Sequence, residues 1–186
     1  MIIILYVYPS QGFCDQYQGN CFIIIGNLIT SKTFSETFEI ESLPEVGISF
    51  DVKKENWPVS ISVDTSYLYT KTEIPSSNDT PDSATQAMFI RSDLGIGLKK
   101  IFDPFTSIKP FVSGGLYMVR MYSKISGKSE ISTAAGYFIS AGTYYKVSEH
   151  VSIGLQWKRS RVDLTIGDHA FDSGGSHLTI LGGFSY

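Results

Sequence analysis

The last ten residues of the chain, 177–186, constrain the fold most, because their side chains alternate strictly between two kinds. The apolar positions are Leu178, Ile180, Gly182, Phe184 and Tyr186. Side chains of a β-strand point to opposite faces in turn, so this pattern predicts a strand with one apolar face. An exposed edge strand of this kind would promote aggregation, whereas a strand that closes a barrel has no free edge. The pattern favours a barrel strand, with the last strand of a β-sandwich as the alternative.

The composition fits a barrel whose outer surface faces lipid. Charged residues make up 18% of the 186 residues, below the roughly 25% of an average soluble protein, and Tyr (11) and Phe (12) are plentiful. The net charge of −3 gives no basic surplus, and no nucleic-acid-binding motif is present, so no nucleic-acid partner is predicted. No apolar run reaches the roughly 18 residues of a membrane-spanning helix, so a membrane could be crossed only by a closed barrel.

Eight alternating runs follow residue 20, at about residues 21–30, 44–54, 59–69, 87–101, 110–122, 134–147, 151–158 and 177–186. Short turns alternate with long polar connections, at residues 32–42, 73–86 and 159–176. Runs of about ten residues match tilted membrane-spanning strands, and this alternation of connections is typical of outer-membrane barrels. We therefore predict an all-β fold, an eight-stranded antiparallel up-and-down transmembrane β-barrel, over residues 21–186.

A soluble eight-stranded barrel of the lipocalin type is the main alternative, and the two differ in which face points inward. The apolar faces carry aromatic residues near the strand ends, among them Tyr67, Tyr69, Tyr145 and Trp157. Aromatic residues in these places are typical of the two interfaces of a membrane. We therefore expect the apolar faces to point outward. The first and fifth runs are apolar on both faces, so their orientation stays open.

Residues 1–12 are predicted to be the remnant of a truncated signal peptide, because an apolar run, MIIILYVY, precedes small and turn-forming residues. The basic residues that normally open such a signal are missing, and a buried N-terminal strand is the alternative. Export would allow a disulfide between Cys14 and Cys21, which we prefer to two free thiols. No second pair of Cys or His lies nearby, so no metal site and no cofactor is predicted.

Five charged residues on the predicted inner faces are expected to pair across the barrel interior, because unpaired buried charges are costly. They are Asp51, Asp64, Arg91, Asp93 and Lys158. The interior of an eight-stranded barrel is just wide enough for side chains to fill it. We expect this set to fill the interior, and the alternative is a narrow ion path or a site for a small polar ligand.

Five basic residues are predicted at the outer rim, namely Lys71, Arg120, Lys124, Arg159 and Arg161. Basic side chains pair with phosphates, so contacts with lipopolysaccharide head groups are one interpretation. Ordinary solvated charges are the other.

No catalytic site is predicted, although Ser and His residues occur in or beside the last long connection. The candidates are His169 with Asp168 and Ser173, and Ser176 with His177. Proximity in sequence does not supply the geometry of an acid, a base and a nucleophile within hydrogen-bonding reach. We therefore expect a protein that is not an enzyme.

Three segments resemble the small eight-stranded outer-membrane barrels of the opacity, OmpA-transmembrane and OmpW type. They are residues 109–117 (KPFVSGGLY), the hairpin 141–148 (AGTYYKVS) with 151–155 (VSIGL), and the aromatic C-terminus. The resemblance implies a bacterial outer-membrane protein, a monomer, whose Leu178, Ile180, Phe184 and Tyr186 form the signal for the barrel-assembly machinery, with periplasmic chaperones as further partners. No periplasmic domain follows the barrel, so peptidoglycan anchoring is not implied.

The resemblance also bears on function. It implies a structural or surface-interaction role, adhesin-like or opacity-like, exerted through the extracellular loops, among outer-membrane lipids and lipopolysaccharide. A small passive channel for hydrophobic or ionic solutes is the alternative, and a lipid A-modifying enzyme comes third.

Overall fold

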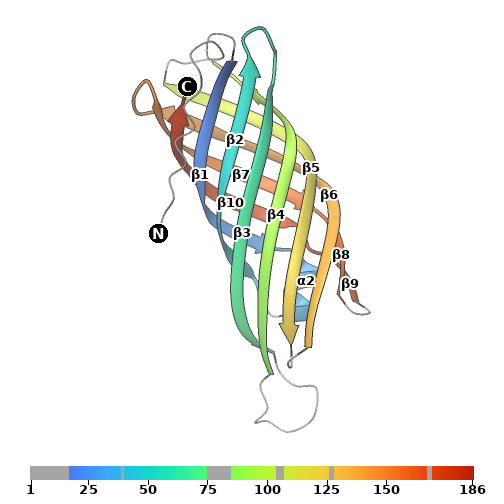
Figure 1. The fold of residues 1–186 in the computed structure, drawn as a ribbon. Coiled ribbons are helices and arrows are strands. Elements are labelled where there is room, and N and C mark those ends of the chain that lie inside the picture. The colour runs from blue at the N-terminus through green and yellow to red at the C-terminus, as the bar shows by residue number, and fades with distance from the viewer. Residues whose placement is uncertain (1–16, 39, 75–84, 104–106, 126–127, 167–168) are drawn as a thin grey trace.

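The chain forms a closed β-barrel in the computed structural model, which describes residues 17–38, 40–74, 85–103, 107–125, 128–166 and 169–186 (Figure 1). The barrel strands are β1 (Tyr17–Thr30), β2 (Ser42–Lys54), β3 (Ser60–Ile74), β4 (Thr85–Ile101), β5 (Ile108–Ile125), β6 (Lys128–Lys146), β7 (Val151–Arg161) and β10 (Gly175–Ser185). A helix, α2 (Lys32–Phe38), and a hairpin of β8 (Asp163–Ile166) and β9 (His169–Asp172) complete the described elements. Residues 1–12 lie outside the described residues.

Each barrel strand pairs antiparallel with its neighbours, in the order β1-β10-β7-β6-β5-β4-β3-β2. The predicted eight-stranded antiparallel barrel is thus confirmed, and the alternating C-terminal run is the strand that closes it against β1. Gly19 and Tyr186 exchange both backbone hydrogen bonds, each 2.9 Å long. The closure leaves no free edge along these strands.

The two ends of the barrel differ. Tight connections join β2 to β3 and β6 to β7 at the end where β10 finishes, which we call the short-turn end (Figure 1). The helix α2 and the β8–β9 hairpin lie at the opposite end, the long-loop end. In outer-membrane barrels short turns face the periplasm and long loops face the outside.

Apolar side chains cover the outside of the barrel. Leu116 is 75% exposed, Phe184 65% and Ile25 62%, although all three lie in regular strands. A soluble barrel would place such residues inside, so the lipocalin-like alternative is wrong. The structure also shows which face of the first and fifth runs points inward. Phe22 and Ile24 of β1 and Phe111 of β5 lie inside the barrel.

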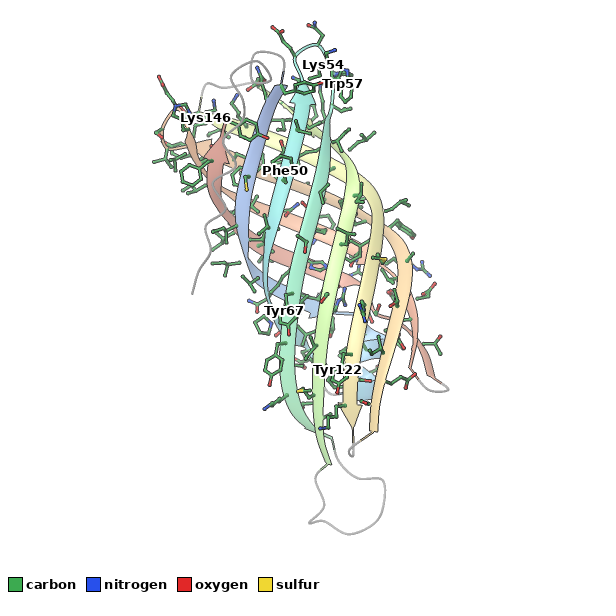
Figure 2. The ribbon with its side chains drawn as sticks, viewed as in Figure 1. Phe50, Lys54, Trp57, Tyr67, Tyr122 and Lys146 are labelled. Atoms are coloured by element: carbon green, nitrogen blue, oxygen red, sulfur yellow. The ribbon has the colours of Figure 1, made fainter. Side chains whose placement is uncertain are left out.

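Aromatic residues lie near both ends of this apolar belt. Phe50 and Trp57 lie toward the short-turn end, and Tyr67 and Tyr122 toward the long-loop end (Figure 2). Such rings combine an apolar body with a polar or polarisable edge, which suits the water–lipid interface. Among the described residues, no helix has the length and apolarity to cross a membrane.

Two predicted loops contain regular structure. The connection 32–42 includes α2, whose first turn is capped when Ser31 Oγ accepts the Phe34 N–H at 3.3 Å. The helix forms because Phe34 is buried against the barrel interior, a contact that the polar composition of this segment did not indicate. The last connection holds β8 and β9, and β8 packs against the free side of β6 beyond the end of its pairing with β7.

Candidate functional site

The structure places all five predicted interior charges inside the barrel. Each of these residues is at most 3% exposed; they are Asp51, Asp64, Arg91, Asp93 and Lys158. Their positions follow from the period of two, since each occupies an inward-facing strand position whose two neighbours in sequence point outward. The charged groups therefore lie in the lumen, shielded from lipid by the barrel wall.

Together with Lys99, these charges form three ion pairs, one of which joins opposite walls of the lumen. Lys158 of β7 lies 3.3 Å from Asp64 of β3, and Lys99 of β4 lies 3.0 Å from Asp51 of β2. The Lys99–Asp51 pair reaches only over the intervening strand β3, and the third pair lies within one strand, so only the Lys158–Asp64 pair crosses the interior as predicted. Arg91 Nε donates to Asp93 Oδ1 at 2.7 Å, and both residues belong to β4. Positions i and i+2 of a strand share a face, which explains this local pairing.

Three further buried polar residues, Lys99, Glu45 and His177, are not among the five interior charges predicted from the sequence. Lys99 shares the inner face of β4 with Arg91 and Asp93 but is not among the five predicted charges. Glu45 lies at the start of β2 and was omitted, although the alternation of that strand, extended by one step, places it inside. His177 was placed at the start of the last run, beside the last connection, but not among the interior residues, and the structure buries it completely in β10.

His177 connects several strands at the level of Glu45. Its Nδ1 lies 2.8 Å from Glu45 Oε2, and its Nε2 lies 3.2 Å from Ser160 Oγ and 3.5 Å from the Tyr117 hydroxyl. Tyr117 in turn donates to Asp93 Oδ2 at 2.7 Å. The contacts that run from Ser160 through His177 to Glu45 are those of the serine, histidine and carboxylate in a catalytic triad.

Access to this group is closed on the outer side by a layer of packed side chains, which we call the apolar cap. It consists of Leu28, Phe34, Ile40, Leu43, Leu68, Ala87, Phe89, Met121 and Leu164. Ser160 is only 1% exposed, and its strand position is paired with Phe138 and Gly175 on its two sides. In the described part of the chain the hydroxyl is therefore buried, and the group links β7, β10 and β2 by hydrogen bonds.

Loop elements hold the apolar cap in place. Phe34 of α2 packs edge-on against Phe89 of β4, with ring centroids 6.1 Å apart. Ser31 Oγ donates to the Asp172 carbonyl, and Arg91 Nη1 donates to the Ser173 carbonyl. Arg91 therefore joins the ion-pair set to the loop that covers it.

Aromatic layers fill the lumen below the cap. Near the short-turn end, the Tyr144 ring stacks between Phe22 and Phe111, with centroid distances of 4.6 and 4.5 Å. Lys99 Nζ lies 5.1 Å from the Phe111 ring centroid, and the residue is only 1% exposed to solvent. Aromatic stacks and ion pairs thus alternate along the axis.

A cavity of about 520 Å³ opens at the short-turn end. Its inner floor is formed by Lys99, Asp51 and Tyr144, where Lys99 Nζ donates to Asp51 Oδ2 at 3.0 Å and to the Tyr144 hydroxyl at 2.9 Å. The cavity therefore ends where the aromatic stack begins.

The five basic rim residues are exposed on the outer wall of the long-loop half. Strand register places Lys71 opposite Met88 and Met88 opposite Lys124, so the two lysines lie two strands apart, or about 10 Å. Arg120 precedes Lys124 by four residues on the same face of β5. On β7, Arg159 donates to Ser176 Oγ at 3.0 Å, and Arg161 lies two residues further on.

The remaining predicted residues lie apart from the lumen. The four residues of the proposed assembly signal all point outward, and the ring of Tyr186 stacks on Phe50 at 6.4 Å. Cys21 is exposed on the outer wall, whereas Cys14 lies outside the described residues, so their disulfide stays a prediction.

The two serine candidates of the last connection make other contacts in the structure. Ser173 Oγ donates to the Val162 carbonyl at 3.1 Å, and Ser176 Oγ accepts from Arg159. Asp168 lies outside the described residues. Within the described ranges, no three His, Cys, Asp or Glu side chains gather so as to hold a metal ion.

Comparison with solved structures finds barrels of the same architecture, while no protein-family model and no curated protein matches the sequence. The outer membrane protein OprG of Pseudomonas aeruginosa aligns with a TM-score of 0.65 and 10% identity, over 92% of this chain and 95% of that one. Ail, the attachment invasion locus protein of Yersinia pestis, aligns with a TM-score of 0.60 and 10% identity, over 92% and 99%. The N-terminal barrel of Pseudomonas aeruginosa OprF aligns with a TM-score of 0.54 and 13% identity, over 92% of this chain and 98% of that one.

At these identities the similarity establishes architecture. The apolar outer belt adds an independent physical argument, because such a surface is stable only in lipid. Together they indicate a location in the bacterial outer membrane. The chain therefore has the fold of the small eight-stranded outer-membrane β-barrels.

Proposed function

We propose that this chain is a non-conducting, non-enzymatic outer-membrane protein that acts through its long-loop end, in a structural or surface-interaction role. The observation that carries the proposal is the filled lumen. The apolar cap, the ion pairs and the aromatic stack follow one another along the axis, and their members are nearly all less than 4% exposed. A continuous water path would require several of these layers to move together.

Strand lengths support a role at the outer surface. β5 and β6 contain 18 and 19 residues, whereas β7 and β10 contain 11 each. About ten residues suffice to cross the membrane, so the longer strands extend beyond it at the long-loop end. This extension, with the β8–β9 hairpin packed against β6, offers a rigid surface to a partner outside the cell.

The basic rim supports lipopolysaccharide as one partner. Lys71 lies on β3, and Arg120 and Lys124 lie on β5, on the other side of β4. All three are next to the aromatic residues of the outer interface, where lipid phosphates lie. Phosphate groups carry negative charge and accept hydrogen bonds, so two lysines about 10 Å apart and an arginine nearby suit a headgroup with separated phosphates.

Single-channel recording in planar bilayers tests the closed lumen. We expect no conductance steps from the wild-type protein. A triple variant, Phe22→Ala, Phe111→Ala and Tyr144→Ala, serves as a comparison because it removes the aromatic stack. Reproducible steps from the wild-type protein would support the passive-channel alternative instead.

Co-purification tests the lipopolysaccharide contact. Lys71→Gln, Arg120→Gln and Lys124→Gln together are expected to reduce the lipopolysaccharide phosphate that stays bound after detergent extraction. The matched control neutralises Lys54 and Lys100, which are exposed on the outer wall at the short-turn end. An equal loss in both proteins, or none in either, would contradict a specific contact at the rim.

A further inference from the structure

The cavity at the short-turn end is lined by charged side chains, most of which take no part in closing the lumen above it. Four lysines line it, contributed by four different strands: Lys53 of β2, Lys99 of β4, Lys109 of β5 and Lys146 of β6. Three carboxylates also line it, those of Asp51, Asp103 and Glu149. Its volume of about 520 Å³ lies within the 300–1,000 Å³ typical of small-molecule sites.

Two of the lysines already have acidic partners. Lys99 pairs with Asp51 at the floor, and Lys109 Nζ lies 2.5 Å from Asp103 Oδ1 near the mouth. These pairs neutralise the floor and one side of the wall. They leave Lys53, Lys146 and the exposed Glu149 of the β6–β7 turn to determine the charge that a ligand meets, so two cations remain against one carboxylate.

Lys53 and Lys146 form no ion pair with any residue in the described part of the chain. In the ring of eight strands, β2 and β6 stand opposite each other, so the two ammonium groups belong to opposite walls. Both side chains are partly buried, which weakens their solvation by bulk water. Neutral polar side chains also line the cavity, among them Asn20, whose amide donates to Asp51 Oδ1 at 2.7 Å, and Ser152.

We propose that this cavity binds a small soluble molecule that carries two phosphate groups. Two cations on opposite walls require a ligand with two separated negative groups, and a phosphate carries more charge and more acceptor oxygens than a carboxylate. Lysine binds phosphate as a point charge with three donors, and the hydroxyl and amide groups supply further donors. The cavity opens along the barrel axis toward the periplasmic side, so the ligand comes from solution.

Equilibrium dialysis with radiolabelled inorganic pyrophosphate tests the proposal, using the full chain folded in a maltoside detergent that contains no phosphate. The double variant Lys53→Gln, Lys146→Gln is expected to bind about 100-fold more weakly, since each lost charge-assisted contact corresponds to about tenfold. Both residues lie at the mouth, so the barrel is expected to fold in the variant.

The control is Lys54→Gln with Lys124→Gln, which removes the same charge from positions outside the cavity (Figure 2 labels Lys54 and Lys146). It should change the affinity by less than twofold. Citrate, which carries carboxylates in place of phosphates, serves as a second ligand and should compete poorly with pyrophosphate for the cavity. Absent binding of pyrophosphate to the wild-type protein, an equal loss in both variants, or equal competition by citrate would each overturn the proposal.

Discussion

Replacing Lys158 by Met should destabilise the barrel strongly, because it leaves Asp64 as a buried charge without its cation. The ammonium lies 3.3 Å from the carboxylate, and both side chains are 3% exposed. At that separation, with an effective dielectric constant of about 20, the attraction is about 5 kcal/mol. Ser49 Oγ still donates to Asp64 Oδ1 at 2.6 Å, which offsets part of the loss. We expect a decrease in unfolding free energy of about 3–5 kcal/mol.

The double variant Lys158→Met, Asp64→Asn should recover most of this loss. The Lys158 ammonium lies over the Tyr117 and Phe138 rings, 5.5 and 5.6 Å from their centroids, and methionine replaces this contact with one between sulfur and the aromatic rings. Asparagine retains an acceptor for Ser49. The coupling energy from the full double-mutant cycle is expected to be about 2–4 kcal/mol, since the penalty arises from one charge without the other.

Urea titration in lipid vesicles measures these differences through the fluorescence of Trp57 and Trp157, which are exposed on the outer surface. The matched control is Lys109→Met. Its ion pair with Asp103 is shorter, at 2.5 Å, but Asp103 is 67% exposed, so less than about 1 kcal/mol is expected. If Lys158→Met had as small an effect as Lys109→Met, the lumen would be hydrated, and the reasoning from a filled lumen would be refuted.

Three further predictions concern the folded barrel. The protein should migrate differently in SDS electrophoresis before and after boiling, because a closed barrel keeps its backbone hydrogen bonds internal until heated; equal mobility would contradict a stable barrel. Gly142→Val should prevent or severely impair refolding, since even a Cβ atom there would lie 2.3 Å from the Leu155 carbonyl oxygen and 2.5 Å from the Phe111 ring. The control variant Gly182→Val should refold normally, because a Cβ atom at that position meets nothing within 4 Å. A small fluorophosphonate should not label Ser160 in the folded protein, because the apolar cap excludes it; stoichiometric labelling, located by mass spectrometry, would show that the Ser160, His177 and Glu45 group is an accessible nucleophilic site.

Strand assignment depended on local information and was therefore accessible from the sequence. A period of two fixes which residues share a face, and in β2 this alone separates Ile48 and Phe50 from Ser49 and Asp51. The abundance of aromatic residues near the strand ends then favoured lipid outside and charge inside. The interior position of Asp64, Arg91 and Lys158 follows from those two steps.

Contacts between distant segments were decided by the tertiary structure. Glu45 and His177 are 132 positions apart, and no periodicity indicates that β2 and β10 flank the same strand at the same height. The tertiary structure also decided which face of β1 points inward. Both faces of this strand are apolar, and the face that carries Phe22 points inward, where Phe22 stacks on Tyr144. Likewise, α2 is held by the burial of Phe34 in a cap assembled from several connections.

The sequence by itself thus determined the architecture of this protein, since alternation, strand length and the order of long and short connections are properties of the chain alone. The tertiary structure decided which charges meet, why the lumen is closed and where a cavity remains at the short-turn end. The physical reason is that barrel closure sets strand stagger and tilt together, and these fix the height at which each inward side chain meets its neighbours.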